Sequence, residues 1–114
     1  MVKDFSVQTG KKITSKGVKT RFINIEEIVY IKCEDYLSNI FLKDGTCIHE
    51  IKTLREFDKE LHELGFFRIR NNIIINENYI TELDTRIDKR AVKLGKFEFF
   101  VAKNRLKTFI NSLS

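Results

Sequence analysis

Three polar residues, Arg70, Asn71 and Asn72, stand between two apolar segments of the chain. Residues 66–70 read FFRIR and alternate apolar with basic side chains, and residues 73–76 read IIIN. This pattern predicts two short strands joined by a turn that exposes the polar side chains. Arginine can make paired hydrogen bonds to guanine in the major groove, and asparagine can do the same to adenine. We therefore hypothesise that the turn reads the base edges of double-stranded DNA.

Plainer explanations exist for some residues around this turn. Asn72 and Asn76 also suit turns with left-handed backbone angles. Arg68 alternates with Ile69 and would then be a solvated strand residue. Residues 73–75 are three isoleucines, which we expect in the core.

The elements that must hold this turn are predicted to be mostly strands. An Asp44-Gly45 pair is a strong hairpin signal inside a three-stranded meander. Gly10-Lys11-Lys12 and Lys16-Gly17 are expected to be turns. Besides the strands on either side of the Asn71-Asn72 turn, alternation predicts strands at residues 3–9, 18–24, 28–33, 39–43, 46–51, 79–87, 91–94 and 97–101. The expected fold class is mostly β, with about 8–10 short strands and two short helices packed on them.

Helical signals occur at two places. Thr53 and Glu56 have the spacing of a capping box, and Gly65 is suited to end the helix that they begin. A second helix is expected to begin near Lys103 or Asn104. The apolar residues at helical spacing are Leu54, Phe57, Leu61 and Leu64 in the first helix and Leu106, Phe109, Ile110 and Leu113 in the second.

Length and composition predict one domain over residues 1–114. No apolar run is long enough to span a membrane, so we expect a cytoplasmic protein without membrane insertion. Its two cysteines, Cys33 and Cys47, are expected to be free thiols.

Charge is unevenly distributed along the chain. Residues 1–22 carry six Lys/Arg and one acid, and residues 86–114 carry eight and two. Residues 23–65 instead carry five basic and ten acidic residues. Basic ends around an acidic middle suggest one cationic face and a polyanionic partner, nucleic acid first and anionic membrane second. A solvated lysine-rich surface explains the charge alone equally well.

The sequence offers little for catalysis, metals or cofactors. It contains no glycine-rich phosphate loop, nucleophile elbow or zinc-protease helix. Cys33, Cys47 and His49 lack a fourth ligand and match no zinc spacing. We therefore expect no enzyme activity, no cofactor and no metal. The aromatics at 66, 67, 97, 99 and 100 are interleaved with aliphatic residues and are predicted to be core, although a stacking surface for single-stranded nucleic acid is the alternative.

The order of motifs resembles the LytTR family of DNA-binding domains from about Lys19 to Leu113. The similarity rests on residues 28–31 (IVYI), the Asp44-Gly45 hairpin, the capped helix, residues 67–76 (FRIRNNIIIN) and residues 101–103 (VAK). The resemblance implies an elongated arrangement of small antiparallel sheets. It also implies a bacterial transcription regulator that binds promoter direct repeats, with loops and not a recognition helix in the major grooves.

The resemblance assigns three DNA-contacting segments to this chain. The implied base contacts are Arg70, Asn71, Asn72 and Asn104. The implied phosphate contacts are Lys103, Arg105, Lys107, Tyr36, Ser38 and Asn39, the last three from a loop over residues 34–39. Asn104 also suits a helix N-cap, and the helix that begins there would favour phosphate at its positive end.

Two departures from the family pattern affect these assignments. Relatives commonly have His-Arg-Ser or His-Asn-Ser where this chain has Arg70-Asn71-Asn72, and Val-Ser-Arg where it has Val101-Ala102-Lys103. Replacing arginine by lysine loses the planar hydrogen-bonding fork, so the base preference of relatives does not transfer.

The partner expected first is double-stranded DNA with direct repeats, with self-association on DNA and a separate receiver or inhibitor protein left open. The alternative function is a protein-interaction module that docks on a membrane-bound or regulatory partner. Exposed strand edges and an amphipathic last helix motivate that alternative.

Overall fold

The computed structural model describes residues 12–14 and 20–113. Within these ranges the chain forms three antiparallel sheets of two, three and five strands. The strands are β1 (Lys12–Thr14), β2 (Thr20–Phe22), β3 (Ile28–Glu34), β4 (Leu37–Leu42), β5 (Cys47–Glu50), β6 (Phe66–Arg70), β7 (Ile73–Asn76), β8 (Glu82–Asp84), β9 (Ala91–Leu94) and β10 (Phe97–Phe100). The mostly β prediction is confirmed.

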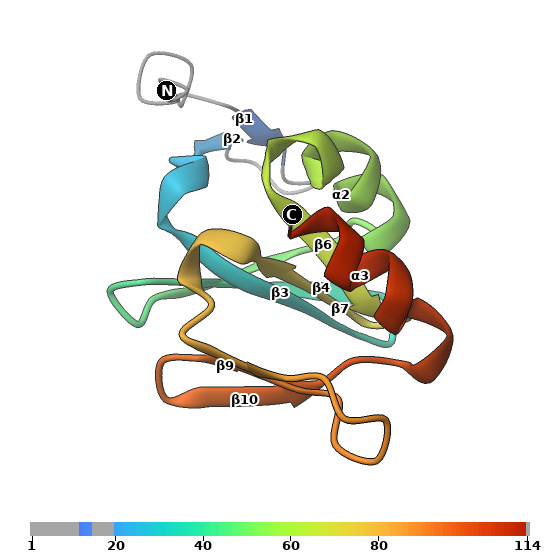
Figure 1. The fold of residues 1–114 in the computed structure, drawn as a ribbon. Coiled ribbons are helices and arrows are strands. Elements are labelled where there is room, and N and C mark those ends of the chain that lie inside the picture. Colours follow the sequence, from blue (N-terminus) through green and yellow to red (C-terminus); the bar gives the residue numbers. More distant parts are fainter. Residues whose placement is uncertain (1–11, 15–19, 114) are drawn as a thin grey trace.

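The five-stranded sheet has the order β5-β4-β3-β7-β6 and lies at the centre of the domain (Figure 1). Its first half is the predicted meander, in which β4 and β5 meet at the Asp44-Gly45 turn and Gly45 has φ +92°. Its second half is the predicted β6–β7 hairpin around Asn71 and Asn72. The hairpin joins the meander through the pairing of β7 with β3.

Each face of this sheet covers a separate apolar core. In β7, Ile74 belongs to one core, whereas Ile73 and Ile75 belong to the other, because neighbouring strand residues point to opposite faces. Helix α2 (Leu54–Leu61) packs on the first face through Leu54, Phe57 and Leu61. On the second face lie helix α3 (Leu106–Ser112) and the three-stranded sheet of β8, β9 and β10 (Figure 1).

Both helices follow the predicted apolar pattern, but their ends differ. Thr53 and Glu56 form a complete capping box at the start of α2. A 3₁₀ turn (His62–Leu64) continues α2, and Gly65 ends it with φ +92° in the left-handed region. The segment Lys103–Arg105 is a 3₁₀ turn, so α3 begins at Leu106. Asn104 caps neither this 3₁₀ turn nor α3. The N-cap residues are Ala102 for the turn and Arg105 for α3, and neither makes a side-chain cap hydrogen bond.

Some strand predictions were wrong or untested. The predicted strand 3–9 and the Lys16-Gly17 turn lie outside the described residues, and Lys12 is in β1 and not in a turn. The predicted strand 79–87 is reduced to β8, because a 3₁₀ turn (Glu77–Tyr79) precedes it and a turn at 87–89 follows.

The loop predicted over residues 34–39 is instead a two-residue turn. β3 continues to Glu34 and β4 starts at Leu37, with Glu34 and Leu37 paired. Asp35 makes this connection with φ +58°, a left-handed conformation that aspartate tolerates better than most residues. Two of the polar residues that suggested a loop, Ser38 and Asn39, therefore belong to β4.

Asn76, at the end of β7, has a structural role that differs from the predicted left-handed turn. Its φ is −90°, and its side chain is buried between a donor and an acceptor. Asn76 Nδ2 donates to the Ile28 carbonyl at 2.9 Å, and Asn76 Oδ1 accepts from the Asn78 amide at 2.9 Å. The side chain thus ties β7 to the start of β3 and caps the following 3₁₀ turn.

We predict that Asn76→Ala lowers the free energy of unfolding by about 1–3 kcal/mol, because it leaves a buried carbonyl unpaired. Urea denaturation followed by circular dichroism measures this change. The exposed neighbour Asn78 is the control, and Asn78→Ala should change stability by less than about 0.5 kcal/mol. Equal effects of the two substitutions would contradict the assigned role.

Candidate nucleic-acid interface

The turn between β6 and β7 lies between two surface grooves that join it to the other two predicted segments. One groove, of about 560 Å³, is lined by Asn71 and Asn72 together with Asp35 and Tyr36. The other, of about 320 Å³, is lined by the same asparagines, Arg70, Phe100 and residues from the Lys103–Arg105 turn. The structure therefore brings the predicted segments together on one side of the domain.

Two arginines hold Asn71 from both its backbone and its side chain. Arg68 donates from Nη2 and Nε to the Asn71 carbonyl at 2.6 and 3.1 Å. Arg105 donates from Nη2 to Asn71 Oδ1 at 3.0 Å and from Nη1 to the Arg68 carbonyl at 3.4 Å. With Oδ1 engaged by Arg105, the Asn71 amide orientation is set, and its Nδ2 group can donate to an acceptor such as a purine N7.

The turn is also anchored through its backbone. The Cys33 amide donates to the Asn72 carbonyl at 2.9 Å, and the Ala102 amide donates to the Ile69 carbonyl at 2.9 Å. The first bond ties the turn to β3, and the second ties the end of β6 to the segment that precedes α3. The polar side chains are consequently presented by a fixed backbone.

Arg70 differs from Arg68 and Arg105 in how its guanidinium is used. Its Cζ lies 4.1 Å from the centre of the Phe100 ring. Within residues 12–14 and 20–113, the Arg70 guanidinium makes no hydrogen bond or ion pair. All five of its N–H donors are therefore available to a ligand.

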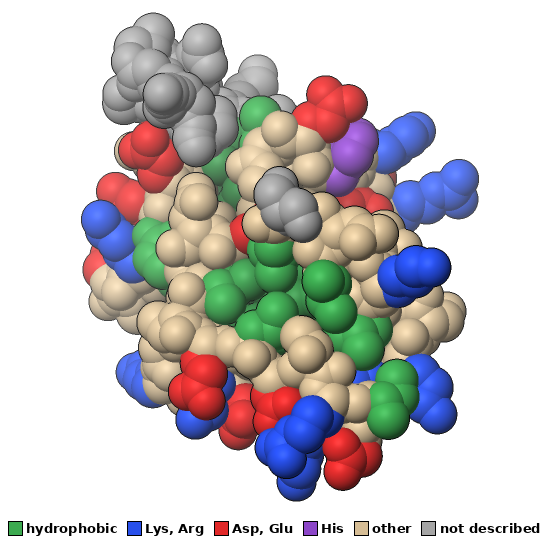
Figure 2. Space-filling model, viewed as in Figure 1, with side chains coloured by type: hydrophobic (Ala, Val, Ile, Leu, Met, Phe, Trp, Pro, Cys, Tyr) green, Lys and Arg blue, Asp and Glu red, His purple; other side chains and the backbone are tan. Residues whose placement is uncertain are grey.

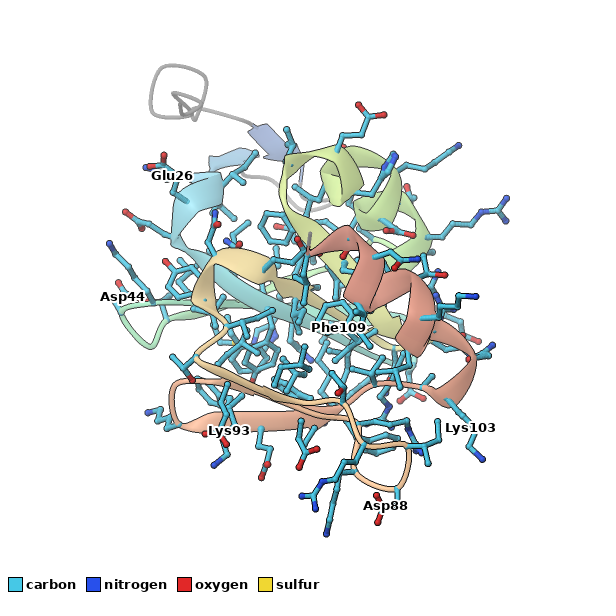
Figure 3. The ribbon with its side chains drawn as sticks, viewed as in Figure 1. Glu26, Asp44, Asp88, Lys93, Lys103 and Phe109 are labelled. Atoms are coloured by element: carbon cyan, nitrogen blue, oxygen red, sulfur yellow. The ribbon has the colours of Figure 1, made fainter. Side chains whose placement is uncertain are left out.

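The remaining predicted residues near α3 are exposed. Lys103, Asn104 and Lys107 are all solvent-accessible, and Figure 3 shows Lys103 projecting away from the domain whereas Phe109 points inward from α3. Tyr36, on the opposite side of the turn, is 87% exposed. These side chains can reach a ligand without rearrangement of the core.

Comparisons with known proteins identify the family of this chain. A family model described as LytTr DNA-binding domain matches residues 18–114. The chain belongs to the LytTR family. This makes it a DNA-binding domain of the transcription-regulator type, and the family is not an enzyme family.

A solved structure with the same fold is the LytTr DNA-binding domain of a protein described as a methyl-accepting/DNA response regulator from Bacillus cereus. The two chains are 16% identical with a TM-score of 0.75, and the similarity covers 90% of this chain and 96% of the other. No curated protein gives a significant match.

Two of the predicted phosphate contacts of the LytTR domain must be corrected. Ser38 is fully buried and donates its hydroxyl hydrogen to the Lys52 carbonyl. Asn39 is buried as well, and its Oδ1 forms a hydrogen bond with His49 Nδ1. Both residues lie in β4, are buried and make side-chain hydrogen bonds within the domain, so neither presents its side chain to DNA.

Sequence reasoning missed the contribution of Phe100 to this surface. Phe66 is buried, and Phe67, Phe97 and Phe99 pack against the core, as predicted, but Phe100 is 45% exposed. The alternation of β10 was the available signal, because it places Phe100 on the same side as Glu98 and opposite Phe97 and Phe99.

Other clusters of charged groups lie away from the turn. Hydrogen bonds from Arg86 lower the pKa of Asp84 to about 2.

In the described part of the LytTR domain no group of three or more His, Cys, Asp or Glu residues is arranged to hold a metal ion. No helix within those residues is both long and apolar enough to cross a membrane.

We predict that Arg105→Lys weakens binding to a specific duplex while leaving binding to random duplex nearly unchanged. Lysine keeps the positive charge but cannot hold Asn71 Oδ1 and the Arg68 carbonyl with one planar group. Fluorescence anisotropy with both duplexes measures the two affinities. In an Asn71→Ala background, Arg105→Lys should weaken binding to the specific duplex little further. The double-mutant cycle should then give a coupling energy between Arg105 and Asn71 of about 0.5–3 kcal/mol. Equal losses on both duplexes would instead identify Arg105 as a phosphate contact.

Proposed function

We propose that this LytTR domain binds direct repeats in promoter DNA by inserting the turn at residues 70–72 into a major groove. In this proposal Arg70 and Asn71 contact base edges, and Asn72 and Asn104 flank them. The proposed phosphate contacts are Lys103, Lys107 and Tyr36, with Arg105 near enough to add its charge.

The observation that carries the proposal is the combination of free donors and a fixed turn. The Arg70 guanidinium stacks on Phe100 and makes no hydrogen bond within the described residues, and the adjacent Asn71 is exposed and already oriented by Arg105. Preorganised side chains lose less conformational entropy on binding, so more of each contact appears as affinity. An arginine and an asparagine placed in this way suit paired contacts to guanine and adenine, worth about 1–3 kcal/mol of discrimination each.

Among the residues that the structure describes, several basic side chains lie near the turn. Arg68, Arg70, Lys103 and Arg105 lie at or beside the grooves. On the α3 face shown in Figure 2, Lys and Arg side chains project around the rim, with Asp and Glu between them. This distribution favours a short footprint on the phosphate backbone for each domain. We propose that two copies bind side by side on the direct repeats.

The alternative is docking on a regulatory protein. Figure 2 shows hydrophobic side chains at the centre of the α3 face, which supports this alternative. However, α3 already uses Leu106 and Phe109 in the core, which leaves Leu113 beyond its end, 39% exposed, as the exposed apolar residue of this segment. Pull-down after nuclease treatment separates the alternatives, because a partner bridged by DNA would be lost.

Single-stranded nucleic acid is a weaker candidate. It needs a row of exposed aromatic rings. Phe67 packs at 5.1 Å between ring centres against Phe109, and Phe99 packs at 4.8 Å against Tyr30. Both rings are therefore engaged in the core.

The direct test is selection of bound sites from random duplex DNA, which yields both the preferred sequence and the spacing of repeats. Enrichment of two similar half-sites at a fixed spacing is expected. Absence of any preference over random duplex would overturn the proposed function.

We predict different effects for two basic residues on the selected duplex. Arg70→Ala should weaken specific binding by about 1–3 kcal/mol and relax the preference at one base pair. Lys107→Ala should weaken binding to all sequences and lower the slope of log K against log salt by about 1. Anisotropy titrations at several salt concentrations measure both quantities. A uniform loss with Arg70→Ala would contradict its role in base recognition.

A further inference from the structure

Phe100 ends β10 with its ring exposed, although its neighbours are embedded in the domain. Phe99, the residue before it, packs against the core, and Val101, the residue after it, is fully buried. Phe100 is 45% exposed and belongs to neither apolar core. A large part of its apolar surface therefore stays exposed to solvent.

Two arginine guanidiniums lie near the Phe100 ring. Arg70 Cζ lies 4.1 Å and Arg90 Cζ 5.9 Å from the ring centre. Arg90 is fixed independently, because its Nε donates to the Val101 carbonyl at 2.8 Å and its Nη1 to the Ile87 carbonyl at 2.6 Å. The Arg70 guanidinium makes no hydrogen bond within the described residues, so this ring is what locates it.

Phe100 also lies where two surface grooves adjoin. It lines the groove that contains Asn71, Asn72 and Asn104, and a second groove of about 420 Å³ that contains Ala91 and Glu98. Arg70 lines both of these grooves. Without the ring the long side chain of Arg70 would be free to move toward either groove, and toward Glu98 in the second.

We propose that Phe100 is a positioning residue for sequence recognition, which holds the Arg70 guanidinium on its ring face with the N–H donors directed to the DNA. A guanidinium that stacks on an aromatic face keeps its in-plane donors free, because the contact uses the face of the group and not its edge. This inference rests on the proposed DNA contact of Arg70 and adds the group that sets its geometry.

The test measures dissociation constants for the selected duplex and for the same duplex changed at the base pair whose preference Arg70→Ala removes. Phe100→Leu should reduce discrimination between the two about three- to tenfold, because leucine offers no aromatic face. Phe100→Trp should retain the discrimination, since tryptophan binds a cation at least as well. Neither substitution changes a charge, so the salt dependence should stay as in the unmodified domain.

A double-mutant cycle separates positioning from direct contact. In an Arg70→Ala background, Phe100→Leu should have no further effect on discrimination. Phe99→Leu is the matched control, because it removes a ring from the core and should lower thermal stability without changing discrimination.

The inference is overturned if Phe100→Leu leaves discrimination between the two duplexes unchanged. It is also overturned if Phe100→Leu lowers discrimination by the same factor in the presence and in the absence of Arg70. In either case the proposed function stands, provided that the unmodified domain still prefers its selected duplex. If the unmodified domain shows no preference for its selected duplex, both the inference and the proposed function are overturned.

Discussion

Burial of β7 on both faces of the central sheet is the constraint on which the proposed recognition surface depends. All residues of β7, Ile73–Asn76, are buried, with Ile74 in the core under α2 and Ile73 and Ile75 in the core under α3 and the small sheet. A strand covered on both faces cannot shift its register by one residue without exchanging the two sets. The turn at Asn71 and Asn72 is therefore fixed in space by the apolar residues that follow it.

The proposed recognition by a turn and not by a helix is consistent with this arrangement. The helices α2 and α3 are short, and the apolar side of each packs against the central sheet. The edge where the β6–β7 turn, the Asp35–Tyr36 turn and the segment before α3 meet stays accessible. The three arginines at this edge have different roles. Arg68 and Arg105 donate hydrogen bonds to the turn, whereas Arg70 stacks on Phe100 and makes no hydrogen bond within the described residues.

Much of the fold and part of the site could be predicted from local signals. The capping box at Thr53 and Glu56, the Asp44-Gly45 hairpin and the β6–β7 turn depend on neighbouring residues, and all were confirmed. The predictions for Ser38 and Asn39 failed because polar residues in a strand resemble a loop when their buried partners are distant in sequence. Those partners are Lys52 and His49, which the pairing of β4 with β5 brings close.

The sequence by itself determined which residues form the turn and that their chemistry suits base edges, because alternation and side-chain type are local properties. Only the tertiary structure decided how each side chain is used. Arg105 lies 34 residues from Asn71 in the chain, and Phe100 is likewise far from Arg70, yet each pair is in contact. The packing of the small sheet and of α3 on the second face of the central sheet creates those contacts. No local pattern reports such packing, so the orientation of the reading side chains appears only when the chain is folded.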